Sequence, residues 1–264
     1  MQIWAIIGVS LIFVLLLTGA PLFIGFSLGA LVVILMVMGT PLCTVASLLF
    51  NSVNSFPLLA CPFFILAGQL LLRGGGMEYL QGLLQSVVGR MQGGIAVAAI
   101  MTGAFLGALS GSSSAGLAIM GTIILPIMVA SGYDRPFSAG IALNAGELSW
   151  IIPPSLALII FGSLTHISIP DLFLGGIGTG TLAAVFMCVY AVFISRRRGY
   201  PAAPAVSWKT RGTLAVKSLP ILLMPVVVLG TIYGGILSPT ESGMTATFYV
   251  LVAGLFVYRR LKWA

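Results

Sequence analysis

Charged side chains are scarce in this chain of 264 residues: they make up 6% of it, whereas hydrophobic residues make up 59%. The mean hydropathy is +1.16. Such a composition predicts an all-α polytopic membrane protein, because each crossing needs about 20 apolar residues in a helix. The length allows several spans and leaves no room for a separate soluble domain.

Cysteine and histidine are also scarce. The chain has three cysteines, odd in number and without metal-ligand spacing, so they predict neither a disulfide framework nor a metal site. No phosphate-binding loop or dinucleotide fingerprint is present. The single histidine, His166, falls in a predicted external loop with no acid placed to orient it, so an intramembrane serine hydrolase is the least favoured hypothesis. We expect no enzyme and no cofactor other than a coupling ion.

Basic residues are absent before Arg73, so the N-terminus lacks the charged leader of a cleaved signal peptide and is interpreted as a retained first span. The net charge of +7 comes mainly from two clusters, which are Arg196, Arg197, Arg198, Lys209, Arg211 and Lys217 in one loop and Arg259, Arg260 and Lys262 at the end. Short cytoplasmic loops carry such an excess, so both clusters are predicted inside and the N-terminus outside, in the periplasm. The alternative is a patch for anionic lipid or nucleic acid; we expect no nucleic acid.

The apolar runs predict a first repeat over residues 1–217, followed by the opening of a second repeat over 218–264. The segment 40–55 is polar and uncharged, and 73–92 is interpreted as a cytoplasmic loop. The predicted elements of the first repeat are spans at about 3–19, 21–38 and 56–72, a re-entrant hairpin at 93–130, a broken span at 137–161, a span at 171–194 and a basic loop at 196–217.

The helical pair within 218–264 begins inside, whereas the pair at 3–38 begins outside. Opposite orientation of matching segments indicates inverted repeats, on which many secondary transporters alternate access. The second repeat has two spans here and neither a hairpin nor a broken helix. We therefore expect this chain not to transport alone; a longer chain, a second polypeptide or self-assembly would supply the rest.

The hairpin tip is rich in serine and glycine. Hydroxyl oxygens and closely approachable backbone suit a sodium ion, and the N-terminus of the following half-helix favours a carboxylate. The alternatives are a flexible turn, small residues for helix packing, or two ordinary tilted spans joined by an external turn. The candidate ion- and substrate-binding residues at the tip are Ser110, Gly111, Ser112 and Ser113.

The broken span offers a second set of polar groups. Adjacent prolines remove two backbone donors and unwind a helix, which frees carbonyl oxygens. An acid near mid-membrane, Glu147, predicts cation or proton binding by default; the alternative is a carboxyl that is held neutral or that faces water. A proline kink used only for packing is the alternative for the whole break. The candidate residues are Asn144, Gly146, Glu147, Ser149, Ile152, Pro153, Pro154 and Ser155, whereas Glu241 is predicted to cap a helix.

Several ordered motifs carry a family resemblance: CPFFILAGQLLLRGG (61–75), LSGSSSAGLAIMGTIILPIM (109–128), IIPPSLALIIFG (151–162) and GGILSPTES (234–242). With them the chain resembles the large membrane subunit of tripartite ATP-independent periplasmic (TRAP) transporters, the DctM-like family. The sequence departs from the family pattern at Glu147, at Ser149-Trp150 and at Gly116, where relatives tend to have small polar residues, Gly-Pro and an acid respectively. Ion stoichiometry and substrate size are therefore not carried over.

This resemblance implies an elevator-type, sodium-driven secondary transporter in the bacterial inner membrane. It would import organic acids, such as dicarboxylates, that a periplasmic binding protein delivers, and a small membrane subunit would complete it. The alternatives are a related carboxylate symporter without a binding protein and a structural membrane subunit. By the same likeness, sodium would be held by Ser110, Ser112 and Ser113 and by the carbonyls of Gly146, Ile152 and Pro153.

Overall fold

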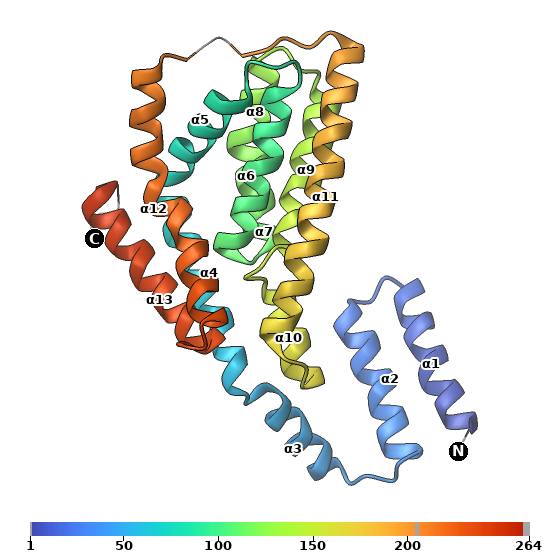
Figure 1. The fold of residues 1–264 in the computed structure, drawn as a ribbon. Helices are drawn as coiled ribbons and strands as arrows, with labels where there is room; N and C mark the ends of the chain where they lie inside the picture. Colours follow the sequence, from blue (N-terminus) through green and yellow to red (C-terminus); the bar gives the residue numbers. More distant parts are fainter. Residues whose placement is uncertain (1, 204–205, 261–264) are drawn as a thin grey trace. The chain divides into compact units, whose positions relative to one another are not determined.

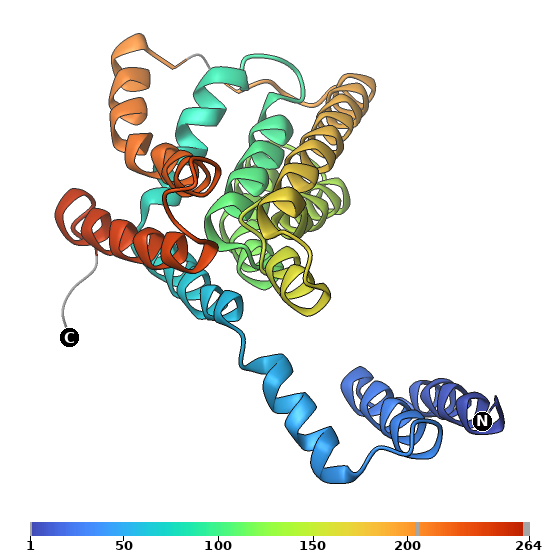
Figure 2. The same ribbon diagram turned by 60° about the horizontal axis from the view of Figure 1, so that its bottom comes forward.

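The computed structural model describes residues 2–203 and 206–260, and all regular structure in these two ranges is helical. The chain divides into two compact units, one that ends at Ser55 and one that begins at Phe56. Each unit is described by itself (Figures 1 and 2). The helical content confirms the predicted fold class.

The first unit contains α1 (Gln2–Leu17), α2 (Leu22–Met36) and α3 (Leu42–Val53). Helices α1 and α2 pack against each other with glycine at the contact: a Cβ added at Gly29 would lie 2.3 Å from Cγ1 of Ile12. Both helices are shorter than the predicted spans, at 16 and 15 residues, and α3 occupies the polar segment 40–55.

The second unit begins with a 3₁₀ turn, Phe56–Leu59, which leads into α4 (Ala60–Arg73) and α5 (Gly76–Val88). The expectation of a loop over 73–92 was wrong, because α5 fills most of it. Met77, Leu80 and Leu84 recur at helical spacing and are buried. A helix over this segment therefore has an apolar face, and burying that face stabilises it.

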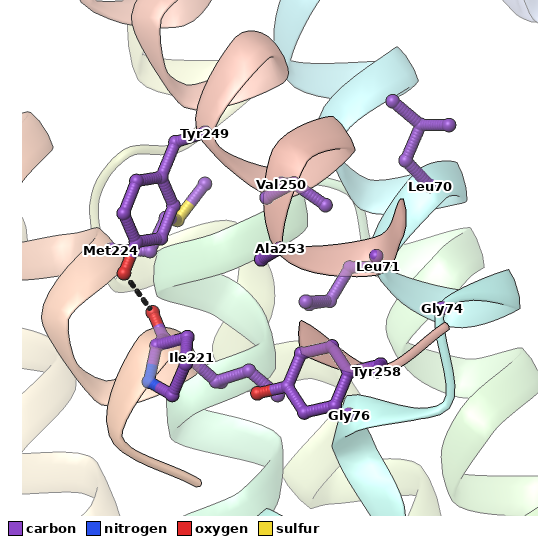
Figure 3. Close-up of a pocket in the computed structure, with 12 residues that line it drawn as sticks. Leu70, Leu71, Gly74, Gly76, Ile221, Met224, Tyr249, Val250, Ala253 and Tyr258 are labelled. Carbon is purple, nitrogen blue, oxygen red and sulfur yellow. Dashed lines mark hydrogen bonds between the residues drawn. The ribbon is translucent and has the colours of Figure 1, made fainter. Parts of the chain in front are cut away.

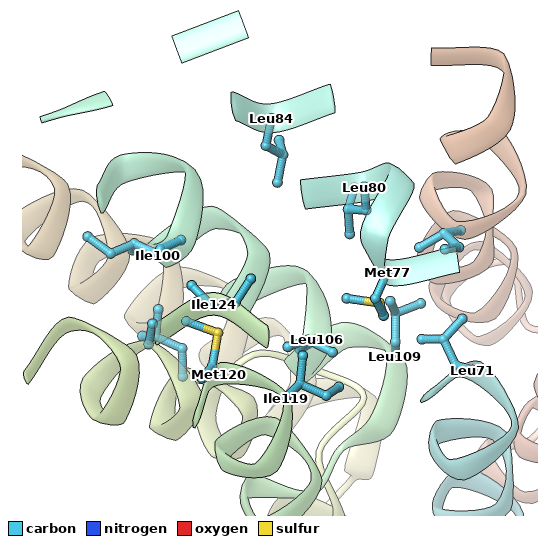
Figure 4. Close-up of a cluster of buried hydrophobic side chains, with 14 of the residues drawn as sticks. Leu71, Met77, Leu80, Leu84, Ile100, Leu106, Leu109, Ile119, Met120 and Ile124 are labelled. Atoms are coloured by element: carbon cyan, nitrogen blue, oxygen red, sulfur yellow. The ribbon is translucent and has the colours of Figure 1, made fainter. Parts of the chain in front are cut away.

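The predicted hairpin consists of α6 (Gly94–Ser110) and a returning arm made of α7 (Ser113–Ile119), a π-helical stretch (Met120–Ile124) and α8 (Leu125–Ala130). Large buried side chains of both arms and of α5 form one core cluster (Figure 4). The hairpin is therefore packed into the body of the unit. Its re-entrant depth in a bilayer stays a prediction.

The predicted broken span is α9 (Arg135–Ile151) and α10 (Leu156–Thr165), and the chain between them is not helical. Asp134 caps α9, since its side chain accepts a hydrogen bond from the backbone N–H of Phe137 at 3.3 Å. The break at Pro153-Pro154 is confirmed. It is shorter than the predicted site segment, because residues up to Ile151 remain helical.

Helix α11 (Ile169–Arg198) is followed by α12 (Trp208–Tyr233), α13 (Pro239–Val252) and a π-helical end (Ala253–Val257). The predicted basic loop 196–217 is mostly helical: α11 extends through its arginines and α12 starts at Trp208, capped by Ser207. Ser238 and Glu241 form a capping box at the start of α13, which confirms the capping role predicted for Glu241. Lys262 of the terminal basic cluster lies outside the described residues.

Six helical segments of the described ranges are long and apolar enough to cross a membrane, which identifies a multi-pass membrane protein. The inverted repeat and the elevator motion stay predictions. The six segments are Phe56–Arg73, Ser113–Ala130, Arg135–Thr165, Ile169–Arg198, Trp208–Tyr233 and Pro239–Val257.

Candidate functional site

The hairpin tip lies directly against the break between α9 and α10. Gly111 ends α6 in the left-handed conformation, with φ of 58°. A Cβ added to it would lie 2.8 Å from the carbonyl oxygen of Pro154. The N–H of Leu156 donates a hydrogen bond to the Gly111 carbonyl at 3.0 Å. Backbone therefore meets backbone here, and only glycine fits.

The hydrogen bond from Leu156 to Gly111 changes which backbone carbonyls near the break receive a hydrogen bond. In a continuous helix the N–H of Leu156 would bond to the carbonyl of Ile152, but it goes to Gly111 instead. Pro153 and Pro154 have no N–H, so the carbonyls of Ser149 and Trp150 also lose their helical donors. These oxygens at the end of α9 need other partners.

Ser155 supplies one of those partners. Its side chain is buried, and its hydroxyl donates to the Trp150 carbonyl at 2.6 Å. The sequence analysis proposed Ser155 as a binding residue. In the structure its hydroxyl instead donates a hydrogen bond to the end of α9. Pro153 and Pro154 beside it are buried.

Ser149 is seated between the two arms of the hairpin. Its side chain is fully buried, and its hydroxyl has no hydrogen-bond partner among the described residues. A Cβ added at Gly116 would lie 2.5 Å from Ser149 Oγ and 3.0 Å from the carbonyl oxygen of Gly146, and one added at Gly107 would lie 2.7 Å from Ser149 Cα. A buried hydroxyl without a partner is destabilising, so such a group calls for an explanation.

The tip serines divide into two kinds. Ser112 and Ser113 are partly buried at the start of α7, and the hydroxyl of Ser112 lies 2.9 Å from that of Ser114. The backbone of Ser110 ends α6, and its side chain lies outside what the structure describes. Of the candidate tip serines, Ser112 and Ser113 are thus the two whose side chains are described.

Asn144 and Glu147 are not brought to the tip. Both are exposed, and they share a face of α9 with Leu143 and Trp150. The Nδ2 group of Asn144 donates to the Gly140 carbonyl at 2.8 Å. The face of α9 that packs on the hairpin is instead formed by small residues, Ala145, Gly146 and Ser149.

Glycine pairs that the sequence analysis did not single out shape the site. A Cβ at Gly103 of α6 would lie 2.3 Å from the Ala145 carbonyl oxygen, and one at Gly176 of α11 would lie 2.6 Å from that of Ile151. Each has a second glycine four residues later, Gly107 and Gly180. This small-residue spacing is the signal of close helix packing in membranes and was available in the sequence.

A separate pocket lies between α4, α12 and α13 (Figure 3). It encloses about 10 Å³, enough for one water at most. Its walls are mainly apolar, and the Tyr249 hydroxyl donates to the Pro220 carbonyl at 2.9 Å. This is a packing gap rather than a substrate site.

Comparison with known proteins decides the family. The profile described as "Tripartite ATP-independent periplasmic transporter, DctM component" matches residues 9–264. The chain belongs to this DctM family. The resemblance drawn from the motifs is confirmed, and the chain is related to transporter permeases rather than to enzymes.

Three DctM relatives show how much of the protein is present. The isethionate TRAP transporter permease protein DctMQ of Oleidesulfovibrio alaskensis is 39% identical over 94% of this chain and 39% of that protein. The C4-dicarboxylate large permease protein DctM of Vibrio cholerae is 35% identical over 96% of this chain and 57% of its own length. The ectoine large permease protein TeaC of Halomonas elongata is 33% identical, over 94% and 58%. The chain thus spans about two fifths to three fifths of these relatives.

Proposed function

We propose that this chain is part of the membrane subunit of a sodium-driven secondary transporter that imports organic acids. The observation that carries the proposal is the fully buried Ser149 hydroxyl, without a partner among the described residues and directly under the serine- and glycine-rich hairpin tip. A bound cation would satisfy it. One relative is named for C4-dicarboxylates, which supports an acid as the substrate.

The groups around Ser149 suit sodium. Hard cations take oxygen ligands, and unwound carbonyls supply them in transporters. We assign the ion to the hydroxyls of Ser112 and Ser113, with Ser149 added to the predicted set. Carbonyls complete it: Ile152 has lost its helical donor to Gly111, and the Gly146 oxygen faces Gly116. Pro153 is the remaining predicted carbonyl ligand, and Ser110 the remaining predicted serine.

The substrate would bind beside the ion. Helix α10 starts at Leu156 directly after the break, and its N-terminal N–H groups favour a carboxylate. In this proposal Gly111 sets the distance between the tip and that helix end. Asn144 and Glu147 lie on the other face of α9 and are not part of this proposed ion and substrate site.

The proposed setting is the bacterial inner membrane, with a small membrane subunit and a periplasmic binding protein as partners. Two contacts support the placing of both basic clusters on the cytoplasmic side together with segment 73–92. Arg260 forms an ion pair with Glu78 at 3.3 Å, and Arg211 donates to the Ser86 carbonyl. From the charge pattern of the sequence, we also propose that the N-terminus is periplasmic.

Sodium binding can be tested on the purified chain. We expect its melting temperature to be higher in sodium chloride than in potassium chloride at equal ionic strength, because a ligand that binds only the folded state stabilises it. The double variant Ser112→Ala, Ser113→Ala should lose this difference. The control is Ser47→Ala, Ser52→Ala in α3, whose hydroxyls donate to backbone carbonyls one turn earlier. Equal melting temperatures in the two salts for the unaltered chain would overturn the ion site.

Transport needs a second assay. The complete permease, reconstituted in proteoliposomes with its small subunit and binding protein, should take up an organic acid only with an inward sodium gradient. Uptake without the binding protein would favour the related symporter class. Uptake that is unchanged by alanine at Ser112 and Ser113 would favour a structural role for this half.

A further inference from the structure

Two apolar grooves flank the end of α11 that carries its arginines. The larger, of about 880 Å³, lies between α9 and α11. Its wall includes Phe137, Ile141, Phe186 and Met187, and Asp134 and Arg198 lie at one end. The volume lies in the range of small-molecule sites.

The smaller groove, of about 440 Å³, lies on the α6 side of the same helix. Val97, Val192 and Phe193 line it, and Arg196 lies among them. Both grooves therefore combine a mainly apolar trough with an arginine from the last turn of α11, and Asn144 is a polar residue in the wall of the larger one. The repetition of this pattern on two sides of one helix argues against a chance gap in packing.

The side of α11 that borders these grooves is apolar and little covered by the rest of the unit. Only 11% of its most apolar stretch is buried inside the unit. Phe186 and Tyr190, which border the larger groove, are 66% and 57% exposed. An amphiphile with an apolar tail fits such a surface better than a polar solute does.

The arginine end of the larger groove is cationic and held in place. Arg198 donates to Asp134 at 3.1 Å and to the Tyr200 hydroxyl at 3.2 Å, yet its side chain stays 53% exposed. Its guanidinium lies 5.9 Å from the ring centre of Phe137. Arg135, Arg196 and Arg197 are exposed nearby in sequence, against the single acid Asp134.

An aromatic cluster fixes this end of the groove. Tyr133 and Tyr200 lie with their ring centres 4.5 Å apart, and both contact Phe137. Burial raises the pKa of the Tyr133 hydroxyl, although its interaction with Ser195 partly offsets this. The tyrosine is thus neutral at physiological pH, and Asp134 is the acid set against the arginines at this end of the groove.

We propose that the groove between α9 and α11 binds an anionic phospholipid, with one acyl chain along Phe137, Ile141 and Phe186 and the phosphate at Arg198. Basic pockets between membrane helices on the cytoplasmic side bind anionic head groups, and arginine matches phosphate geometry well. The groove beside Arg196 accommodates the second chain. The inference concerns the face of α9 opposite Ser149 and does not depend on the proposed ion site.

The probes are dioleoyl phosphatidylglycerol and dioleoyl phosphatidylcholine, which share their acyl chains and differ in net charge. Native mass spectrometry of the purified chain should show more retained phosphatidylglycerol than phosphatidylcholine. Arg198→Gln should weaken phosphatidylglycerol binding about fivefold, since one cation near a membrane surface contributes about that factor. Arg73→Gln, which removes the same charge at the end of α4, should leave binding unchanged.

A second pair of variants tests the acyl part without touching the ion pair. Gly140 lines the groove, and a Cβ added there would meet nothing within 4 Å, so the larger side chain of Gly140→Leu is expected to extend into the groove. Gly178→Leu on α11 is the control, because its Cβ also meets nothing and it lines neither groove. We expect Gly140→Leu to abolish retention of phosphatidylglycerol and Gly178→Leu to preserve it.

Three results would overturn the proposal: equal retention of the two lipids, an Arg73→Gln loss as large as that of Arg198→Gln, or unchanged retention in Gly140→Leu. Should Arg198→Gln fail to fold for want of its contact with Asp134, the glycine pair decides.

Discussion

Gly111 is the residue whose replacement tests the packing of the hairpin tip against the helix break most directly. Gly111→Ala forces a non-glycine residue into the left-handed region, at a cost of about 1–2 kcal/mol. The new Cβ would also lie 2.8 Å from the Pro154 carbonyl oxygen, so the tip must move away from the break. Movement weakens the hydrogen bond from Leu156 to Gly111, worth about 0.5–1.5 kcal/mol. The total expected loss of unfolding free energy is about 1.5–3.5 kcal/mol.

Gly199 provides a matched control. It ends α11 as Gly111 ends α6, also in the left-handed conformation with φ of 68°, but an added Cβ would meet nothing within 4 Å. Gly199→Ala should therefore show only the backbone cost of about 1–2 kcal/mol. Denaturant unfolding of both variants in mixed micelles, followed by tryptophan fluorescence, measures the difference. Equal losses in the two variants would refute the close contact between tip and break.

Three further predictions concern single polar side chains. Ser149→Ala removes a buried hydroxyl that lacks a partner among the described residues, so in potassium it should leave stability unchanged or raise it by up to about 1 kcal/mol, while the extra stability in sodium is lost. Melting curves in both salts measure this, and a retained sodium effect would contradict the role of Ser149 as a ligand. Glu147→Gln should alter the pH dependence of uptake by the complete transporter, because it removes the acid on the exposed face of α9; an unchanged pH profile would indicate a structural role. Ser238→Ala removes the cap of α13 and should cost about 1 kcal/mol in unfolding free energy, whereas Thr245→Ala, further along the same helix, serves as the control; an equal effect of both would argue against the capping box.

The position of the helix break could be predicted because its cause is local. Pro153 and Pro154 lack the N–H that a helix needs, and no tertiary contact can restore it. The position of the hairpin tip could be predicted for a similar reason, since Gly111 lies in a run of serines and readily adopts the left-handed conformation of a turn. Such features depend on a few neighbouring residues, and the pairing of the two prolines matters, because the isolated Pro220 and Pro225 stay inside α12.

The direction in which each side chain points could not be predicted in the same way. Asn144 and Glu147 are polar and close to the break in sequence, but helical periodicity turns them away from Gly146 and Ser149. Which of the two faces meets the hairpin depends on the partner helix, whose Gly103 and Gly107 admit only small residues. The prediction of a loop over 73–92 was wrong for a related reason. The charged residues of this segment drew attention away from the apolar face of α5, which becomes evident only from what it packs against.

The two faces of α9, one with Ser149 and the other with Glu147, lie in different surroundings. The face at Ser149 is closely covered by the hairpin, since a Cβ added at Gly116 would lie 2.5 Å from Ser149 Oγ. The face at Glu147 is exposed within a segment apolar enough to span a membrane. A carboxylate facing hydrocarbon is costly, and membrane proteins turn such groups toward the protein interior or a water-filled cavity. In the bilayer the Glu147 side chain itself therefore has to meet either water or a polar group of another helix, and the Glu147→Gln profile reports on whichever is present.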